Sequence, residues 1–239
     1  LDPAPDMVPA LQALQGEGGR APTAFADARP WVSNGAAGML RVGFGTLPEP
    51  ERERLYARYI ALYAARLAVE TRLFDGMGAV LDALEAAGVP WGVVTNKAAH
   101  LTEPLLDALG LLRRCACVVS GDTTPFRKPH PGPVRHALAL VPVAAGSALY
   151  VGDAERDIVA GRAAAAMRHR LRKVPHQFVA LREHLLALPG PHLRDALQQL
   201  VETRQVVARA FREVGAAEER LAVGGQEHRQ RPAARPPGD

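Results

Sequence analysis

The chain has 239 residues, of which 48% are hydrophobic, so it contains enough apolar material to bury a core. Its net charge of +4 is unevenly distributed, because residues 1–167 carry 16 Lys and Arg against 17 Asp and Glu, whereas residues 168–239 carry 13 against 8. The basic charge gives no indication that the larger part binds nucleic acid. We find no secretory signal, no membrane-spanning stretch and too few cysteines for a disulfide framework, and therefore expect a cytoplasmic protein.

Residues 3–72 are predicted to be mostly helical. The strongest pattern covers residues 49–73, where a proline followed by acidic residues marks the start of a helix. Its apolar stripe at helical spacing consists of Leu55, Tyr59, Leu62, Tyr63 and Leu67. Residues 31–38 are expected to form a loop of small residues whose backbone amides can face a ligand, with an ordinary helix connection as the alternative.

From residue 73 to residue 167, predicted strands alternate with predicted helices, which is typical of parallel βαβ units. The strands are expected at 89–95, 115–119 and 148–151, and the helices at 77–84, 102–109, 133–140 and 154–167. Ligands bind such sheets at the carboxyl ends of the strands. Polar residues follow all three strands there, so the sequence predicts a site at that edge.

Asp153 and Asp157 form the most informative pattern at this edge. They follow a strand-like apolar segment that ends in Gly152, and a glycine permits the sharp turn that puts Asp153 at the strand end. If a helix begins there, the two carboxylates lie one turn apart on the same face. Two hard oxygen ligands held in this way suit Mg²⁺. The structural alternative is a helix-capping Asp153 and a surface Asp157.

Two further positions are candidates for contact with phosphate. Thr95 and Asn96 follow the first strand and offer a hydroxyl and backbone amides to a phosphoryl oxygen. Lys128 lies in an extended segment beside prolines, where its ammonium group can neutralise phosphate charge. Separately these residues have ordinary interpretations, as a strand-to-helix cap and a surface lysine. Their order on successive units of one sheet favours a common site.

These motifs resemble those of the haloacid dehalogenase superfamily of phosphatases, and within it the phosphoglycolate phosphatase group. Val-Val-Thr-Asn-Lys at 93–97 resembles the second motif of the family, Lys-Pro-His-Pro at 128–131 the third, and Gly-Asp-Ala-Glu-Arg-Asp at 152–157 the fourth. The resemblance covers roughly residues 1–167. By this similarity Thr95 and Asn96 bind the phosphoryl group, and Lys128 stabilises its charge.

The resemblance also implies the metal, the fold and the domains. Asp153 is expected to ligate Mg²⁺, and Asp157 to assist in the network of metal and lysine. The implied fold is α/β, with an all-helical cap at residues 6–72 and a Rossmann-like parallel sheet core at residues 73–167. The cap loop that contains Ser33, Asn34, Gly35 and Gly38 is expected to face the leaving group and to determine the substrate.

Two parts of the family pattern are not matched. The family nucleophile and its acid/base partner are the two carboxylates of an Asp-x-Asp-Gly-Thr motif, which this sequence lacks together with the central strand that carries it. Residues 168–239 also diverge, which indicates either a frameshift or fusion, or a real basic tail that is partly helical and partly disordered. We do not expect the tail to bind nucleic acid, because its basic residues are mixed with acids and almost free of aromatics.

Three functional hypotheses follow. The first is a magnesium-dependent phosphatase of a small phosphorylated metabolite, with 2-phosphoglycolate as the expected substrate. The second is a sugar-phosphate phosphatase, such as one acting on N-acetylmuramic acid 6-phosphate. The third is a truncated chain that keeps phosphate and metal contacts but is inactive, because an aspartate nucleophile contributes orders of magnitude to the rate. The protein is expected to be a monomer or a homodimer.

Overall fold

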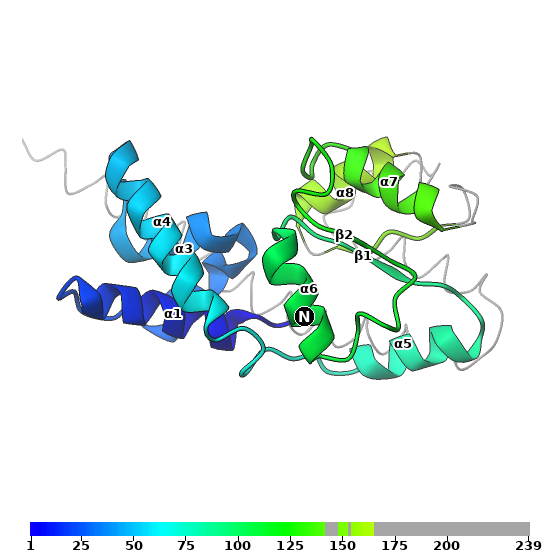
Figure 1. The fold of residues 1–239 in the computed structure, drawn as a ribbon, viewed down its shortest axis with the longest axis horizontal. Helices are drawn as coiled ribbons and strands as arrows, with labels where there is room; N and C mark the ends of the chain where they lie inside the picture. The colour runs from blue at the N-terminus through cyan, green and yellow to red at the C-terminus, as the bar shows by residue number, and fades with distance from the viewer. Residues whose placement is uncertain (142–147, 153, 165–239) are drawn as a thin grey trace, which may run out of the picture.

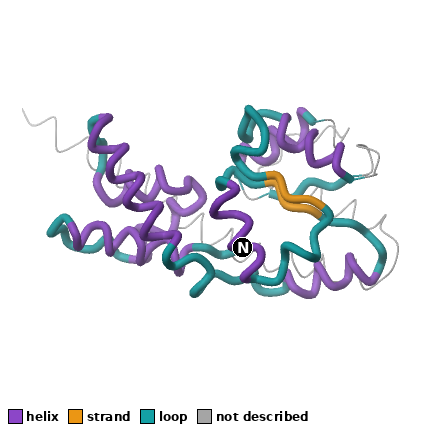
Figure 2. The backbone as a smooth tube through the Cα atoms, viewed as in Figure 1, coloured by secondary structure: helices purple, strands orange, loops and turns teal. Residues whose placement is uncertain are grey.

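Helices make up the first part of the chain, and helices around a pair of strands make up the second (Figure 1, Figure 2). The computed structural model describes residues 1–141, 148–152 and 154–164. The helices of the first part are α1 Ala4–Glu17, α2 Phe25–Ala28, the 3₁₀ helix η1 Arg29–Asn34, α3 Gly35–Phe44 and α4 Glu49–Ala64. The second part contains α5 Met77–Ala86, β1 Gly92–Val94, α6 Ala99–Ala108, β2 Cys117–Val119, α7 Gly132–Leu140 and α8 Glu155–Ala163.

Helices α1, α3 and α4 enclose an apolar core. Leu11, Met39 and Tyr59 are fully buried where these helices meet. The Tyr59 hydroxyl donates a hydrogen bond of 3.1 Å to the Met7 carbonyl, so its polar end is satisfied inside this core. The Tyr59 ring also stacks on Tyr63 one turn later on α4, at 6.4 Å between ring centroids. Leu55, Tyr59 and Tyr63 of the predicted stripe therefore form the buried face of the helix, whereas Leu67 lies beyond its end.

Helix α4 ends at Ala64, nine residues before the predicted end at residue 73. The chain leaves the helix because Asp6, which is fully buried, accepts hydrogen bonds from the backbone amides of Glu70 and Thr71. The Thr71 hydroxyl donates a further bond of 2.7 Å to the same carboxylate. A buried carboxylate needs such donors, and helical residues could not offer their amides to it.

The predicted loop at residues 31–38 is helical instead, which corrects the sequence interpretation. It consists of the last residues of η1 and the first turn of α3. Gly35 allows the junction, because its φ of 66° is one that other residues rarely adopt. Gly38 allows the two helices to approach, because a Cβ there would lie 2.5 Å from the Trp31 carbonyl oxygen. Both glycines thus have a structural reason that the sequence pattern did not reveal.

Strands β1 and β2 pair in parallel, as the alternation of strands and helices predicted. Their register places Gly92 opposite Cys117 and Val94 opposite Val119. The third predicted strand, at residues 148–151, is wrong for the described residues, because nothing there pairs with it by a ladder of backbone hydrogen bonds. The segment still lies beside β1, since the Tyr150 hydroxyl is 3.4 Å from the Val94 carbonyl oxygen.

The two ends of the helical segment meet. Asp2 and Arg72 form an antiparallel bridge, in which the Asp2 amide donates to the Arg72 carbonyl at 2.8 Å. Arg29 adds a two-pronged ion pair to the Asp2 carboxylate, at 2.5 and 3.0 Å. The boundary between domains near residue 72 remains a prediction, and residues 168–239 lie outside the described part of the chain.

Candidate active site

The carboxyl ends of β1 and β2 lie on the side of the sheet that faces the helical segment (Figure 1). Thr95 comes directly after β1, and its amide donates to the Val119 carbonyl at 2.9 Å. Its hydroxyl oxygen accepts a hydrogen bond of 3.1 Å from the Lys97 amide. The chain therefore turns tightly after Thr95, and the predicted site residues gather on this turn and on the segments beside it.

Lys128 is the best-anchored charge of this region. Its ammonium group donates to the Val94 carbonyl at 2.7 Å and to the Tyr150 hydroxyl at 3.0 Å. It also forms an ion pair of 2.7 Å with Asp157, and the two side chains are only 8% and 7% exposed. Charges this well buried must be paired, because leaving either one alone costs several kcal/mol. The structure thus brings together the predicted lysine and the second predicted carboxylate.

Asn96 fixes the backbone of Lys128. Its side-chain amide donates to the Lys128 carbonyl at 2.9 Å, and its side-chain oxygen accepts from the Lys128 amide at 3.0 Å. The sequence predicted that Asn96 binds phosphate. Because both ends of its side chain are occupied, Asn96 contributes by holding Lys128 between the turn after β1 and the segment before α7.

Asp157 lies in the first turn of α8. Its second oxygen accepts a hydrogen bond of 3.2 Å from the Ala154 amide, which is a capping interaction at the helix start. A Cβ on Gly152 would clash with this side chain, so the glycine of the predicted motif is needed for close packing. Asp153 lies outside the described residues. Among residues 1–141, 148–152 and 154–164, no group of three or more metal-ligating side chains is found.

The predicted specificity segment reaches the same region from the helical side. The Ser33 carbonyl accepts a hydrogen bond from the guanidinium of Arg156, on the turn of α8 that carries Asp157. Ser33 and Asn34 are exposed, whereas Gly38 is buried against η1. The exposed residues of the segment therefore lie near the site, and Gly38 serves the packing of the helices.

Sequence reasoning missed a contact between Lys97 and Tyr63. The Lys97 ammonium donates to the Tyr63 hydroxyl at 2.8 Å and lies 4.3 Å from the centre of its ring. Desolvation lowers the pKa of Lys97 to about 8, and it raises the pKa of Tyr63 above its usual value. Lys97 belongs to the recognised second motif, but no periodicity in the sequence relates it to a tyrosine on α4.

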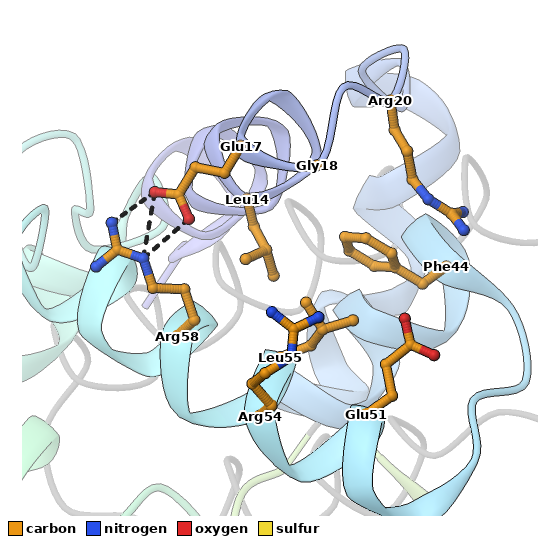
Figure 3. Close-up of a pocket in the computed structure, with 9 residues that line it drawn as sticks. All are labelled: Leu14, Glu17, Gly18, Arg20, Phe44, Glu51, Arg54, Leu55 and Arg58. Atoms are coloured by element: carbon orange, nitrogen blue, oxygen red, sulfur yellow. Dashed lines mark hydrogen bonds and ion pairs between the residues drawn. The ribbon is translucent and has the colours of Figure 1, made fainter.

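A pocket of about 250 Å³ lies elsewhere, between α1, α3 and α4 (Figure 3). Glu17 and Arg58 pair across one of its walls, and Arg20 lies over the Phe44 ring at another. Its lining consists of Leu14, Glu17, Gly18, Arg20, Phe44, Glu51, Arg54, Leu55 and Arg58. None of the motif residues lines it, so this pocket is separate from the candidate active site.

Comparison with known proteins places this geometry in a family. The family model described as haloacid dehalogenase-like hydrolase matches residues 40–171, which is more than half of the chain. The chain belongs to the haloacid dehalogenase-like hydrolases. A phosphoglycolate phosphatase of Xanthomonas campestris pv. campestris strain 8004 is 44% identical over 164 residues, or 69% of this chain and 74% of the relative. An N-acetylmuramic acid 6-phosphate phosphatase of Pseudomonas aeruginosa is 37% identical over 163 residues, or 68% of this chain and 72% of the relative.

Solved structures of haloacid dehalogenase-like proteins share the fold. A crystal structure named as a predicted phosphoglycolate phosphatase from Haemophilus somnus 129pt matches with a TM-score of 0.59 and 25% identity, over 67% of this chain and 75% of that one. CbbY from Rhodobacter sphaeroides, solved in complex with phosphate, matches with a TM-score of 0.54 over 70% and 83% of the two chains. At 17% identity, CbbY supports the fold alone. The α/β architecture predicted from the sequence is confirmed.

Among the described residues, no helix is both long enough and apolar enough to cross a membrane.

Proposed function

We propose that this site binds and hydrolyses a small phosphomonoester, with 2-phosphoglycolate as the substrate. The observation that carries the proposal is the Lys128 ammonium group, held by Asp157, Val94 and Tyr150 at the carboxyl ends of two parallel strands. A fixed, largely desolvated cation neutralises a phosphoryl group far better than a mobile surface lysine. The relatives named phosphoglycolate phosphatase support the choice of substrate.

The residues around Lys128 have distinct parts in this function. Thr95 stands at the strand end, where a hydroxyl and backbone amides can hold phosphoryl oxygens. Asn96 keeps the Lys128 backbone in place through its two hydrogen bonds. Asp157 pairs with the ammonium group and restrains its direction. Together they pre-organise positive charge where the transferred phosphoryl group develops negative charge.

Asp153 and Asp157 are our proposed ligands for Mg²⁺. Carboxylate oxygens at the mouth of a phosphate site are the donors that Mg²⁺ prefers, and the acidic start of α8 supplies them. Asp157 already contacts Lys128 and the Ala154 amide, so we assign it an assisting part. Asp153, which lies outside the described residues, is the proposed direct ligand on the basis of the sequence motif. When bound, Mg²⁺ would add charge neutralisation at the phosphoryl oxygens.

N-acetylmuramic acid 6-phosphate is a second candidate substrate. A relative from Pseudomonas putida with that name is 36% identical over 163 residues, besides the one from Pseudomonas aeruginosa. The two candidates differ greatly in the size of the leaving group. Substrate choice is therefore proposed to depend on the exposed part of the segment that contains Ser33 and Asn34, which lies beside α8.

The test is phosphate release from both compounds with Mg²⁺, measured for the 239-residue chain and for a chain extended upstream by an Asp-x-Asp-Gly-Thr segment. We expect the 239-residue chain to bind 2-phosphoglycolate without turnover, and the extended chain to hydrolyse it. A folded, extended chain that hydrolyses neither compound would contradict the proposed function. Turnover by the 239-residue chain would contradict the proposed need for the upstream aspartates. Gel filtration of the same samples distinguishes a monomer from a homodimer. We propose that the protein is located in the cytoplasm.

A further inference from the structure

Lys97 is a second cation near the strand ends, and unlike Lys128 it has no ionic partner among the residues that the structure describes. Its ammonium group is partly buried and donates to the neutral hydroxyl of Tyr63. No carboxylate of the described residues lies within ion-pair distance of it, whereas Lys128 faces Asp157 at 2.7 Å. Removing an ammonium group from water without an anion is unfavourable. An anionic ligand beside Lys97 would therefore stabilise its charge.

The backbone of Lys97 is held rigidly beside the proposed phosphate site. Its amide donates to the Thr95 hydroxyl at 3.1 Å. Its carbonyl accepts from the Gly121 amide at 2.8 Å and from the Thr102 hydroxyl at 3.1 Å. The turn that carries Thr95 therefore also fixes the base of the Lys97 side chain.

The Tyr63 hydroxyl orients the ammonium group of Lys97. The Tyr63 oxygen accepts a hydrogen bond from Lys97, and the lysine keeps two further N–H groups. Because Tyr63 is only 1% exposed, Lys97 is the residue of this pair that can meet a ligand. The raised pKa of Tyr63 keeps its proton in place, and the pKa of Lys97, about 8, keeps the amine charged at neutral pH. The two remaining N–H groups of this oriented ammonium group can donate to the oxygens of a carboxylate.

We propose that Lys97, positioned by Tyr63, binds a carboxylate on the leaving group, so that this enzyme selects phosphomonoesters of hydroxy acids over those of neutral alcohols. The proposal rests on the proposed function, since it assigns the rest of the same substrate. Glycolate and N-acetylmuramic acid, which occur in the names of the relatives, are both carboxylic acids. Lys97 comes from the α/β part and Tyr63 from α4, so the site is complete only where the two parts meet.

The test compares the affinities of two phosphate esters that differ in one group. 2-Phosphoglycolate carries the carboxylate, and 2-hydroxyethyl phosphate replaces it by a neutral alcohol of similar size. Titration calorimetry with Mg²⁺ measures both dissociation constants for the 239-residue chain, so turnover is not required. We expect 2-phosphoglycolate to bind at least about tenfold more tightly, which corresponds to one charged hydrogen bond.

Variants separate a carboxylate site from a general structural role. Lys97→Met is expected to bring the ratio of the two affinities close to one, and Tyr63→Phe to bring it to an intermediate value. Lys97→Arg, which keeps the charge, should retain a ratio well above one. Arg113→Met is the matched control, because it removes one positive charge from an exposed position and should leave the ratio unchanged.

The outcomes distinguish a failure of the carboxylate site from a failure of the proposed phosphatase function. A Lys97→Met chain that weakens both esters equally, or neither, overturns the carboxylate site and leaves the phosphatase proposal intact. If Lys97→Met fails to fold, an unchanged ratio of the two affinities in Tyr63→Phe overturns the carboxylate site in the same way. A wild-type chain that binds neither ester overturns the proposed function, and the carboxylate site with it.

Discussion

In the helical segment, the largest fully buried side chains are Tyr59, Tyr63, Leu11 and Met39, whereas the candidate site of the α/β part is built around an ion pair between Lys128 and Asp157. The first arrangement gains free energy from removing apolar surface from water. The second costs desolvation energy, which is offset only while both charges and their hydrogen bonds are in place. The contrast suggests that the helical segment supplies folding stability, whereas the α/β part gives up some folding stability to hold buried charges for function.

Removing the charge of Lys128 is expected to have the largest effect. Lys128→Met leaves the buried Asp157 carboxylate without its partner, so the free energy of unfolding should fall by about 3–5 kcal/mol and phosphate binding should be lost. Denaturant unfolding and titration with 2-phosphoglycolate measure the two effects. Arg114→Met is the control, because it breaks exposed ion pairs with Asp82 and Glu85 and should leave the midpoint unchanged. Equal shifts in the two variants would remove the contrast between buried and exposed charges.

Truncating Leu11 tests the apolar side of the comparison. Leu11→Ala creates a cavity between α1 and α3, where the Leu11 side chain fills the space left by Gly43, and should destabilise by about 3 kcal/mol. Leu140→Ala, at a residue that is 52% exposed, should change the unfolding free energy little. If the two parts unfold separately, only the transition of the helical segment should move. If Leu11→Ala lost as much phosphate affinity as Lys128→Met, the helical segment would contribute to binding as well as to stability, contrary to the comparison.

Adding a methyl group at Gly152 tests the packing around the ion pair. Gly152→Ala places a Cβ against the Asp157 side chain, and this overpacking should cost about 1–3 kcal/mol and weaken phosphate binding. Gly78→Ala is the matched change on α5, where no atom outside the neighbouring residues and the helix's own backbone lies within 4 Å of the new Cβ, and it should stabilise the helix by roughly 0.5–1 kcal/mol. A tolerated Gly152→Ala would mean that the carboxylate has room to move.

The smallest expected effect comes from a single hydroxyl group in the helical core. Tyr59→Phe removes the hydrogen bond to the Met7 carbonyl and leaves that carbonyl buried, so the unfolding free energy should fall by about 1 kcal/mol. Tyr56→Phe, at a residue that is 44% exposed, should have no measurable effect in the same denaturant titration. If Tyr59→Phe lowered the unfolding free energy as much as Lys128→Met, polar interactions would stabilise both parts to a similar degree, and the contrast between them would fail.

Local patterns in the sequence predicted those features that depend on local geometry. Helical spacing identified the buried face of α4, and the alternation of elements identified the parallel pairing of β1 with β2. The resemblance to the haloacid dehalogenase family also placed Lys128 and Asp157 in one network, and the two side chains form an ion pair of 2.7 Å.

Features that depend on contacts between distant residues were not predicted. Helix α4 stops early because a carboxylate from the start of the chain captures the amides of Glu70 and Thr71. The side chain of Asn96 holds the Lys128 backbone through both of its ends, a contact between residues 32 positions apart. The pairing of Lys97 with Tyr63 depends on how two parts of the chain pack. No spacing rule within either segment contains that information.

The bridge between Asp2 and Arg72 has a consequence for how such proteins can change over evolutionary time. Because Asp2 pairs with Arg72, residues 3–71 form an inserted segment whose two ends are adjacent. An inserted segment of this kind can be lengthened, shortened or exchanged for another without distorting the sheet. New leaving groups can then be accommodated by changes in this segment, while the phosphate chemistry is inherited unchanged.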